Sequence, residues 1–256
     1  MIEIPDLLVL AKKIAKDAGT NFKASKLDQM RGIEGTMLGG KEVKIVADRV
    51  LNDALLKALR PTGLPILSEE SGILGEFSSS GLIWIVDPLD GSINYLRGIG
   101  PSAVSIALWQ GSIPLFGVLY DLDKELLSWG GKNFGSWSSG SPIYTSTVNV
   151  KEQAIIFSGI PARFPIEDEK RVTLFFNEVS GFLKVRMIGS AAISLLKVAE
   201  GLGDAYFEDQ VMLWDIAAGL AILEGAGGEY KIYQNNYMSP CKVFASNGYL
   251  LSSFID

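Results

Sequence analysis

The segment Leu82–Val86 is a continuously apolar run that ends directly at Asp87. A short apolar run without polar alternation is typical of a strand that is buried on both faces of its sheet. Three further strand-like segments follow at short intervals, Ala103–Trp109, Ile113–Tyr120 and Glu125–Trp129. Successive strands joined by short turns predict a mostly antiparallel sheet rather than a repeat of strand–helix–strand units.

Helical spacing of apolar residues marks two segments before this sheet. An apolar stripe over residues 4–18 predicts a helix that ends at Gly19. A second helix is expected from Val46 to Leu59, where the proline at position 61 stops it. Each of these helices therefore has one apolar face.

The stretch Gly130–Ser141 is rich in Gly, Ser and Asn, which favours a border between two domains, residues 1–141 and residues 142–256. Strand-like and helix-like segments alternate beyond this border. The expected strands are Ala154–Ile160, Phe182–Ile188, Ala205–Phe207, Glu229–Ile232 and Val243–Ser246. The expected helices are Glu167–Ser180, Ala191–Glu200 and Trp214–Glu224.

The chain has no histidine, and this absence restricts the chemistry open to it. It excludes phosphohistidine chemistry, zinc sites with histidine ligands and every Ser–His or Cys–His nucleophile. No arginine follows Cys241, so a cysteine nucleophile with a phosphate-binding arginine close behind it is excluded too. Carboxylates, hydroxyls, lysine or tyrosine must therefore carry any acid–base or metal chemistry.

Charge and hydropathy limit the partners and the location that we expect. The net charge of -6 argues against nucleic acid or an anionic membrane as the main partner. No apolar run reaches the ~18 residues that span a bilayer, and no basic stretch leads into an apolar one at the N-terminus. Cys241 is the only cysteine, so no disulfide can form within the chain. We expect a soluble, cytoplasmic protein.

Two aspartates stand at the end of the apolar strand. Asp87 and Asp90 lie three residues apart, and the backbone carbonyl of Leu89 lies between them. Carboxylate and carbonyl oxygens suit Mg²⁺. Gly91 and Ser92 follow, where backbone N–H groups and a hydroxyl can bind a phosphate. The alternative is a turn that is merely capped by aspartates.

Three other polar segments invite either a structural or a functional reading. Glu69 and Glu70 follow an apolar segment, although paired glutamates usually form a solvated surface. Asp215 opens an apolar helix and can be a metal ligand or simply a cap. The turn Ile188–Ala192 joins a strand to a helix, and its Gly-Ser pair can be a cap or a contact to phosphate or sugar.

Together these segments resemble the inositol monophosphatase family. The sequences WIVDPLDGSINY, the upstream SEES, GSAA, DAYFE and WDIAAG occur there in the same order and at similar spacing, from about Ala47 to Gly228. The superfamily is lithium-sensitive and also contains fructose-1,6-bisphosphatases and nucleotide 3′-phosphatases. The resemblance implies a layered αβαβα sandwich, with an α+β N-terminal half, an α/β C-terminal half and the site between them. It also implies a homodimer.

The resemblance assigns roles to individual residues. The implied metal ligands are Glu69, Asp87, the Leu89 carbonyl, Asp90 and Asp215, holding two or three Mg²⁺ ions that Mn²⁺ can replace. The implied catalytic residues near the attacking water are Glu70, Asp48 and Ser92, where Ser92 stands in place of the family's usual threonine. The implied substrate contacts are Asp90, Gly91, Ser92, Gly189, Ser190, Ala191 and Glu208.

The implied reaction is the hydrolysis of a small phosphorylated polyol or sugar. Inositol 1-phosphate, fructose 1,6-bisphosphate or both are the expected substrates, and divalent ions activate the attacking water. One alternative is a phosphatase of 3′-phosphoadenosine 5′-phosphate from the same superfamily. Another, from a different class, is a metal-binding interaction module without turnover. The concurrence of all the ligands favours the enzyme.

Two weaker signals complete the sequence. Asp121 and Asp123 follow an apolar strand, as in aspartyl-phosphate enzymes of the haloacid dehalogenase superfamily, but Glu125 stands where that motif has Thr or Val. A polar hairpin turn is the favoured interpretation. Arg163 and Arg186 can each bind a second phosphate, and Arg186 is the preferred candidate because it lies three residues before Gly189. The alternative is an exposed arginine without a specific role.

Overall fold

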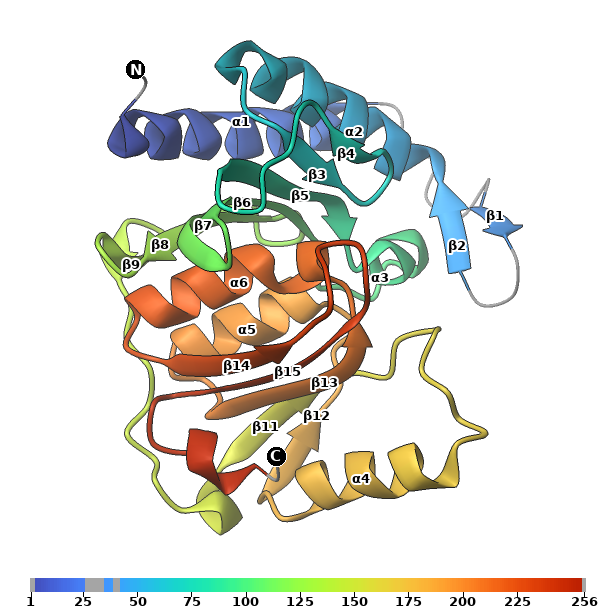
Figure 1. Cartoon of the computed structure of the whole chain (residues 1–256), viewed down its shortest axis with the longest axis vertical. Helices are drawn as coiled ribbons and strands as arrows, with labels where there is room; N and C mark the ends of the chain where they lie inside the picture. The colour runs from blue at the N-terminus through green and yellow to red at the C-terminus, as the bar shows by residue number, and fades with distance from the viewer. Residues whose placement is uncertain (1–2, 26–34, 39–41, 255–256) are drawn as a thin grey trace.

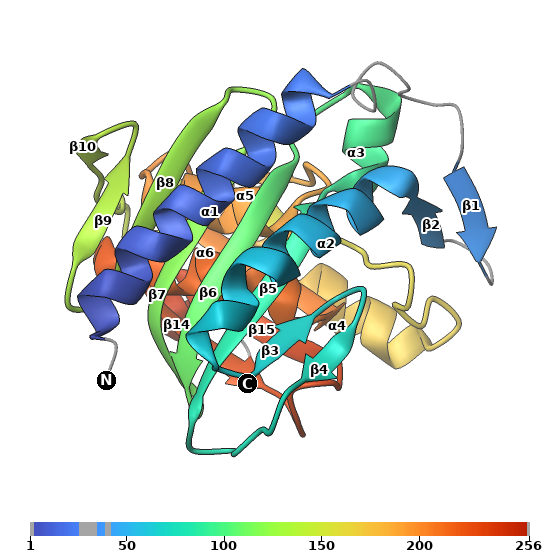
Figure 2. The same ribbon diagram turned by 90° about the horizontal axis from the view of Figure 1, so that it is seen from above.

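The computed structural model describes residues 3–25, 35–38 and 42–254, and it consists of alternating layers of helix and sheet. The helices α1 (Ile4–Ala24) and α2 (Val46–Leu59) form the first layer, and Figure 2 shows them lying across one sheet. Helices α5 (Ala191–Ala199) and α6 (Leu213–Gly225) lie between the two large sheets, and α4 (Glu169–Ser180) covers the far side (Figure 1). The expected αβαβα sandwich is confirmed.

The first large sheet has eight strands in the order β10-β9-β8-β7-β6-β5-β3-β4. Their bounds are β3 Ile66–Ser68, β4 Gly72–Leu74, β5 Leu82–Asp90, β6 Ala103–Gln110, β7 Ile113–Asp121, β8 Leu126–Gly131, β9 Gly135–Ser138 and β10 Ser141–Pro142. Only β3 and β5 pair in parallel, so the predicted antiparallel sheet is confirmed. A separate antiparallel pair, β1 (Gly35–Leu38) and β2 (Glu42–Ile45), precedes α2.

The second large sheet has five strands in the order β12-β11-β13-β15-β14. Their bounds are β11 Ile155–Ser158, β12 Lys184–Arg186, β13 Ala205–Val211, β14 Glu229–Tyr233 and β15 Cys241–Ser246. Strand β11 runs parallel to both neighbours, whereas β15 is antiparallel to β13 and β14. A short helix, α3 (Ser92–Arg97), follows β5.

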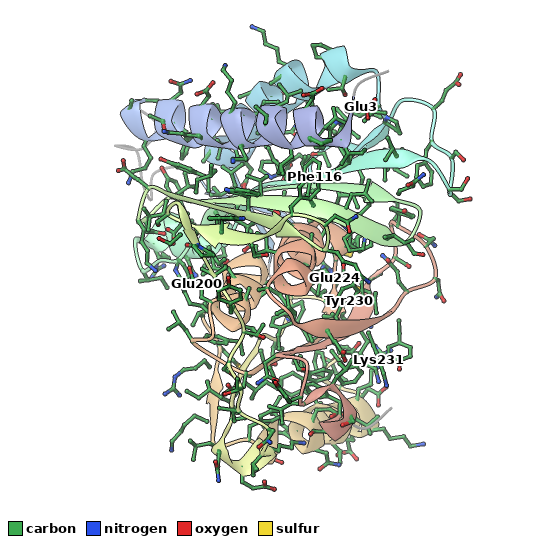
Figure 3. All side chains as sticks on the ribbon, turned by 90° about the vertical axis from the view of Figure 1, so that its left-hand side faces the viewer. Glu3, Phe116, Glu200, Glu224, Tyr230 and Lys231 are labelled. Atoms are coloured by element: carbon green, nitrogen blue, oxygen red, sulfur yellow. The ribbon has the colours of Figure 1, made fainter. Side chains whose placement is uncertain are left out.

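Helix α6 is apolar on all sides because it is enclosed between the two sheets. It approaches β7 so closely that a side chain at Gly117 would meet helix backbone, with a Cβ only 2.2 Å from the carbonyl oxygen of Ala218. Figure 3 shows side chains filling the spaces between layers, including Phe116, which packs on the side of α1 and α2. Within the described residues no helix is both long and apolar enough to cross a bilayer.

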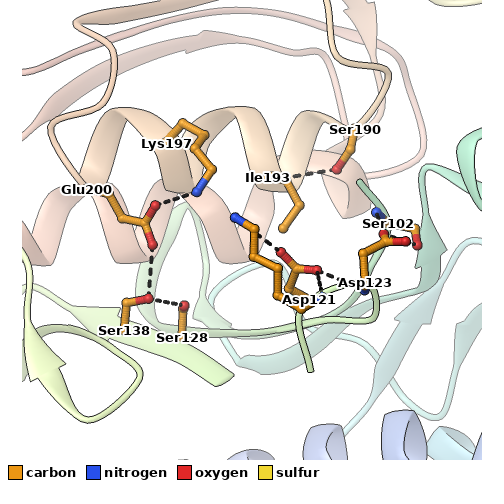
Figure 4. Close-up of polar contacts among 10 residues, drawn as sticks. Ser102, Asp121, Asp123, Ser128, Ser138, Ser190, Ile193, Lys197 and Glu200 are labelled. Atoms are coloured by element: carbon orange, nitrogen blue, oxygen red, sulfur yellow. Dashed lines mark hydrogen bonds and ion pairs between the residues drawn. The ribbon is translucent and has the colours of Figure 1, made fainter. Parts of the chain in front are cut away.

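Packing corrects the expected end of the first helix. Helix α1 continues past Gly19 to Ala24, because Gly19 makes room for the ring of Tyr120 rather than ending the helix; a Cβ there would lie 2.2 Å from that ring. The stretch expected to be a border contains β9, which pairs with β8. Ser138 of β9 donates to Glu200 at 2.9 Å, so this strand also contacts the end of α5 (Figure 4). The division at residue 141 stays a proposal, and its outer limits 1 and 256 lie outside the described residues.

Candidate active site

Three elements bring carboxylates to one end of the first sheet. The strands β3 and β5 are parallel neighbours, so their carboxyl ends meet at the same edge. Glu69 follows β3 and donates its backbone N–H to the carbonyl of Val86 at 3.3 Å. Strand β5 continues through Asp87 to Asp90, with a register shift between these two residues. Helix α6 begins near this edge and carries Asp215 in its first turn.

Glu69, Asp87 and Asp215 form a tight acidic cluster. One carboxylate oxygen from each lies within 4.8 Å of the others. Backbone groups orient two of them: Asp87 accepts from the N–H of Leu89 at 2.9 Å, and Asp215 accepts from that of Met212 at 3.0 Å. Three hard oxygen donors at this spacing fit Mg²⁺ or a similar divalent ion.

Burial raises the pKa of the cluster's aspartates. Desolvation is the main cause of the raised pKa of Asp87 and of Asp215, and the negative charges of Glu69 and Asp90 raise both further. Burial likewise raises the pKa of Asp90 to about 7, although hydrogen bonds from Ser190 and from backbone N–H groups oppose the shift. Carboxylates that repel one another in a buried site are stabilised by a cation, so the electrostatics agree with the donor set.

Asp90 connects the acidic cluster to the second half of the chain. It accepts a hydrogen bond from the hydroxyl of Ser190 and another from the backbone N–H of Ala192 at 3.1 Å. Ser190 also caps α5, because its hydroxyl accepts from the N–H of Ile193 at 3.2 Å (Figure 4). The turn before α5 is therefore fixed against the end of β5.

A cleft of about 380 Å³ opens beside this cluster. Almost all the residues that the sequence pointed to line it. They are Asp48, Glu69, Glu70, Asp87, Leu89, Asp90, Gly91, Ser92, Gly189, Ser190, Ala191, Glu208 and Asp215. Residues that are as far apart in sequence as Asp48 and Asp215 thus face one cavity.

Arg186 is the exception among the predicted residues. It is exposed at the end of β12, donates to the carbonyl of Val185 at 3.1 Å and does not line the cleft. Arg163, the less favoured arginine, does line it, and it donates to the carbonyl of Gln210 at 3.3 Å. Arg186 lies three residues before Gly189, which suggested that it is close to the cleft. This spacing does not show which way the edge strand β12 directs the Arg186 side chain.

Glu208 lies on β13 with its carboxylate in the cleft wall. Tyr206, two residues earlier on the same face of the strand, donates its hydroxyl to Oε2 of Glu208 at 2.6 Å. Burial raises the pKa of Glu208 to about 7; the bond from Tyr206 opposes this, Asp90 adds to it and Arg163 opposes it. Gly159 gives this carboxylate room, since a Cβ there would lie 2.8 Å from both of its oxygens.

Several residues line the cleft in addition to those expected from the sequence. They are Ile93, Asn94, Ser158, Gly159, Ile160, Pro161, Ala162 and Ser194. Asn94 lies inside the motif WIVDPLDGSINY, so its position was a usable signal. The segment 158–162 carries no distinctive motif.

Asp121, the residue of the rival aspartyl-phosphate interpretation, lies outside this cleft. The predicted turn is present, but Asp121 is buried rather than solvated. Its carboxylate accepts from the backbone N–H groups of Asp123 and Lys124, both at 2.9 Å (Figure 4). Asp123 in turn accepts from the N–H of Ser102 at 2.9 Å. These contacts give Asp121 a structural role in the turn.

The fold and the cleft define a layered α+β protein whose acidic site lies where the two halves of the chain meet. The inositol monophosphatase family matches residues 6–254 of the chain, and the chain belongs to that family. This agrees with the resemblance seen in the motifs.

Individual relatives are similar to the chain at moderate identity. The fructose-1,6-bisphosphatase/inositol-1-monophosphatase of Aquifex aeolicus is 34% identical over 172 residues, which are 65% of this chain and 62% of the relative. An inositol-1-monophosphatase of Synechocystis is 33% identical over 189 residues, 72% of this chain and 64% of the relative. The matched segments thus span less than two thirds of both relatives. The structure of inositol monophosphatase from Anabaena superposes with a TM-score of 0.82 at 27% identity, covering 98% of this chain and 94% of that one.

Proposed function

We propose that the protein is a Mg²⁺-dependent phosphomonoesterase that hydrolyses inositol 1-phosphate, fructose 1,6-bisphosphate or both. The observation that carries this proposal is the cluster of Glu69, Asp87 and Asp215 beside the Gly91–Ser92 segment in one cleft. The names of the Aquifex and Synechocystis relatives support the choice of substrates. The homodimer implied by the family resemblance and the cytoplasmic location expected from the sequence are also part of this proposal.

The chain's own groups divide into ligands and groups that handle substrate. Glu69, Asp87, Asp90, Asp215 and the Leu89 carbonyl would hold two or three Mg²⁺ ions, with Mn²⁺ as a substitute. When bound, such ions polarise the phosphate oxygens, assist the attacking water and neutralise charge on the leaving oxygen.

The remaining cleft residues bind the substrate and orient the attacking water. Glu70 and Asp48 hold the attacking water and accept its proton, and the Ser92 hydroxyl helps to orient it. The backbone of Gly91 and Ser92 binds the phosphate oxygens. The opposite wall of the cleft is formed by Gly189, Ser190 and Ala191, which contact the substrate there.

Glu208 is assigned to the substrate hydroxyls. Its Oε2 already accepts from Tyr206, and we expect Oε1 to accept from the polyol. A fixed hydrogen bond on one oxygen orients the other, which favours one arrangement of the sugar or inositol ring.

A panel of substrates tests the proposed function. Phosphate release is measured with inositol 1-phosphate, fructose 1,6-bisphosphate and 3′-phosphoadenosine 5′-phosphate, in Mg²⁺ and in excess chelator. We expect turnover of one or both of the first two, and none in chelator. Preference for the nucleotide would move the protein to that branch of the superfamily, and no release from any of them would favour a metal-binding interaction module.

Thermal unfolding with and without Mg²⁺ gives a second prediction. The raised pKa values of Asp87, Asp90 and Asp215 mean that the folded, metal-free protein binds more protons than the unfolded chain above about pH 4. Its stability should therefore fall as the pH rises from about 4 through the raised pKa of Asp90 at about 7, and the raised pKa values of Asp87 and Asp215 act in the same direction. A cation relieves the same repulsion, so the stabilisation by Mg²⁺ should grow over this pH range.

At a Mg²⁺ concentration about 100 times its Kd, binding adds about 2.7 kcal/mol. For a chain of this size that corresponds to a rise in Tm of roughly 5–10 °C at pH 8, and we expect a much smaller rise at pH 5. Calorimetry at both pH values makes the comparison. An equal rise at the two pH values would show that the ion binds elsewhere.

The two arginines give a third prediction, which concerns the substrate. Arg163 lines the cleft and its charge acts on Glu208 and Asp215, whereas Arg186 is turned to the surface. We expect Arg163→Ala to raise the KM for fructose 1,6-bisphosphate about tenfold and the KM for inositol 1-phosphate by less than about threefold, because only the former carries a second phosphate. Arg186→Ala is the matched control and should leave both KM values unchanged. The reverse pattern would restore Arg186 as the phosphate-binding residue.

A further inference from the structure

Asn94 lies where three segments of the cleft meet. It belongs to α3, and its side chain is only 6% exposed. Its Nδ2 donates to the carbonyl of Pro101 at 3.0 Å and to the carbonyl of Ile188 at 2.7 Å. The second of these bonds joins residues 94 positions apart and crosses from the first half of the chain to the second.

The chemistry of the two acceptors restricts which side chain can do this. Both are backbone carbonyl oxygens, which only accept hydrogen bonds. The side chain between them must therefore carry two hydrogen-bond donors on one group. The NH₂ group of Asn94 does so. Leucine has nearly the same shape and no donor, and serine has a single donor. The bond to the Ile188 carbonyl is partly buried, so removing its donor would leave that carbonyl without this partner at a cost in free energy.

The backbone around Asn94 is packed without spare room. A Cβ at Gly91 would lie 2.7 Å from the Pro101 carbonyl oxygen and 3.3 Å from that of Gly189. A Cβ at Gly189, whose φ is +74°, would lie 2.8 Å from Oδ1 of Asn94. The segments are therefore in direct contact, and a displacement of one moves the others.

We propose that Asn94 is a positioning residue that sets the separation of the two cleft walls. One wall carries Asp90, Gly91 and Ser92, and the other is the turn at Gly189 and Ser190. Asp90 and Ser190 also bond to each other, but a carboxylate that ligates a metal shares its charge with the ion, whereas the amide of Asn94 is committed to the two carbonyls. The proposal rests on the proposed function, because it concerns how the phosphate ester is held.

Misplacement of reacting groups by about 1 Å costs about a hundredfold in rate, so loss of this junction should affect both binding and turnover. Asn94→Leu keeps the size and removes both donors. We expect it to lower kcat/KM about a hundredfold and to weaken inhibition by inorganic phosphate. Hydrogen–deuterium exchange should rise at residues 98–102 and at residues 186–192, on both sides of the junction.

Asn247→Leu is the matched control. Asn247 is 1% exposed, and its Nδ2 donates to the Val148 carbonyl at 2.7 Å and to the Ser146 hydroxyl at 2.9 Å. It does not line the cleft. Its replacement should lower Tm as much as the Asn94 variant does, yet leave kcat/KM within about twofold and exchange at residues 186–192 unchanged.

If Asn94→Leu does not fold, the same measurements are made on Asn94→Ser, which keeps one donor. Normal kinetics in a folded Asn94 variant, or unchanged exchange at residues 186–192, would overturn the proposal. Failure of both Asn94 variants to fold while Asn247→Leu folds would assign Asn94 to the fold as a whole and overturn it too. Absence of turnover in the unmodified protein would reject the proposed function alone, because the exchange measurement still decides the role of Asn94.

Discussion

Asp90→Asn is expected to reduce turnover and Mg²⁺ affinity by on the order of a hundredfold or more. The substitution keeps the size of the side chain and removes the charge of a proposed ligand. The amide oxygen can still accept from the Ser190 hydroxyl and from the Ala192 N–H, so the turn before α5 should stay in place. The loss would then come from the missing charge rather than from a disturbed fold.

The Tm of the metal-free Asp90→Asn variant distinguishes a loss of ligand charge from a disturbed fold. Burial makes ionisation of Asp90 costly, as its raised pKa of about 7 shows, so the neutral amide should not lower the metal-free Tm at pH 8. The rise in Tm on adding Mg²⁺ should largely disappear. Calorimetry together with steady-state kinetics measures both effects.

Asp121→Asn is the matched control for Asp90→Asn. Asp121 is also a buried aspartate, and an asparagine oxygen can keep its bonds from the N–H groups of Asp123 and Lys124. The marginal ion pair with Lys124, at 4.0 Å, is lost, so the cost in stability should stay within about 1 kcal/mol and kcat should not change. An inactive but folded Asp121→Asn beside an active Asp90→Asn would establish the aspartyl-phosphate mechanism instead.

Gly117→Ala is expected to destabilise the protein by about 3 kcal/mol or more. The new methyl group would lie 2.2 Å from the carbonyl oxygen of Ala218 and 2.6 Å from its Cα, which are backbone atoms of α6. A buried helix between two sheets cannot move without disturbing both, so the cost should exceed the usual 1–3 kcal/mol of overpacking. The corresponding fall in Tm is roughly 6–12 °C.

The same substitution should reach the proposed metal site, because α6 carries Asp215. We expect a smaller Mg²⁺-induced rise in Tm than in the unmodified protein. Gly81→Ala is the matched control, since the nearest atoms to a Cβ there are those of Ser78 at 3.4 Å, an ordinary contact. It should leave stability the same or slightly higher. Equal stability of the two variants would contradict the close approach of α6 to β7.

Local sequence information was sufficient for most elements, whereas the set of proposed metal ligands came from the resemblance of the motifs to the family. Asp87 and Asp90 are fixed to the end of β5 by chain connectivity, and an apolar strand without alternation can only be buried. Helix α2 begins and ends where its apolar spacing and Pro61 predict. The order of the motifs suggested that Glu69 and Asp215 share a site. The fold explains the position of Glu69 through the parallel pairing of β3 and β5, and that of Asp215 through the first turn of α6.

Contacts between distant segments decided the rest. Gly19 was expected to end a helix, but its role is set by Tyr120, which lies on another strand. The choice between Arg163 and Arg186 depends on which side chain faces the cleft, and sequence distance carries no such direction. The second acceptor of Asn94, the Ile188 carbonyl, is a backbone group that the sequence does not distinguish from any other. The sequence by itself, through its motifs and their resemblance to the family, indicated which side chains can bind a cation. Only the tertiary structure decided which groups hold these side chains in place, because packing joins segments that share no local pattern.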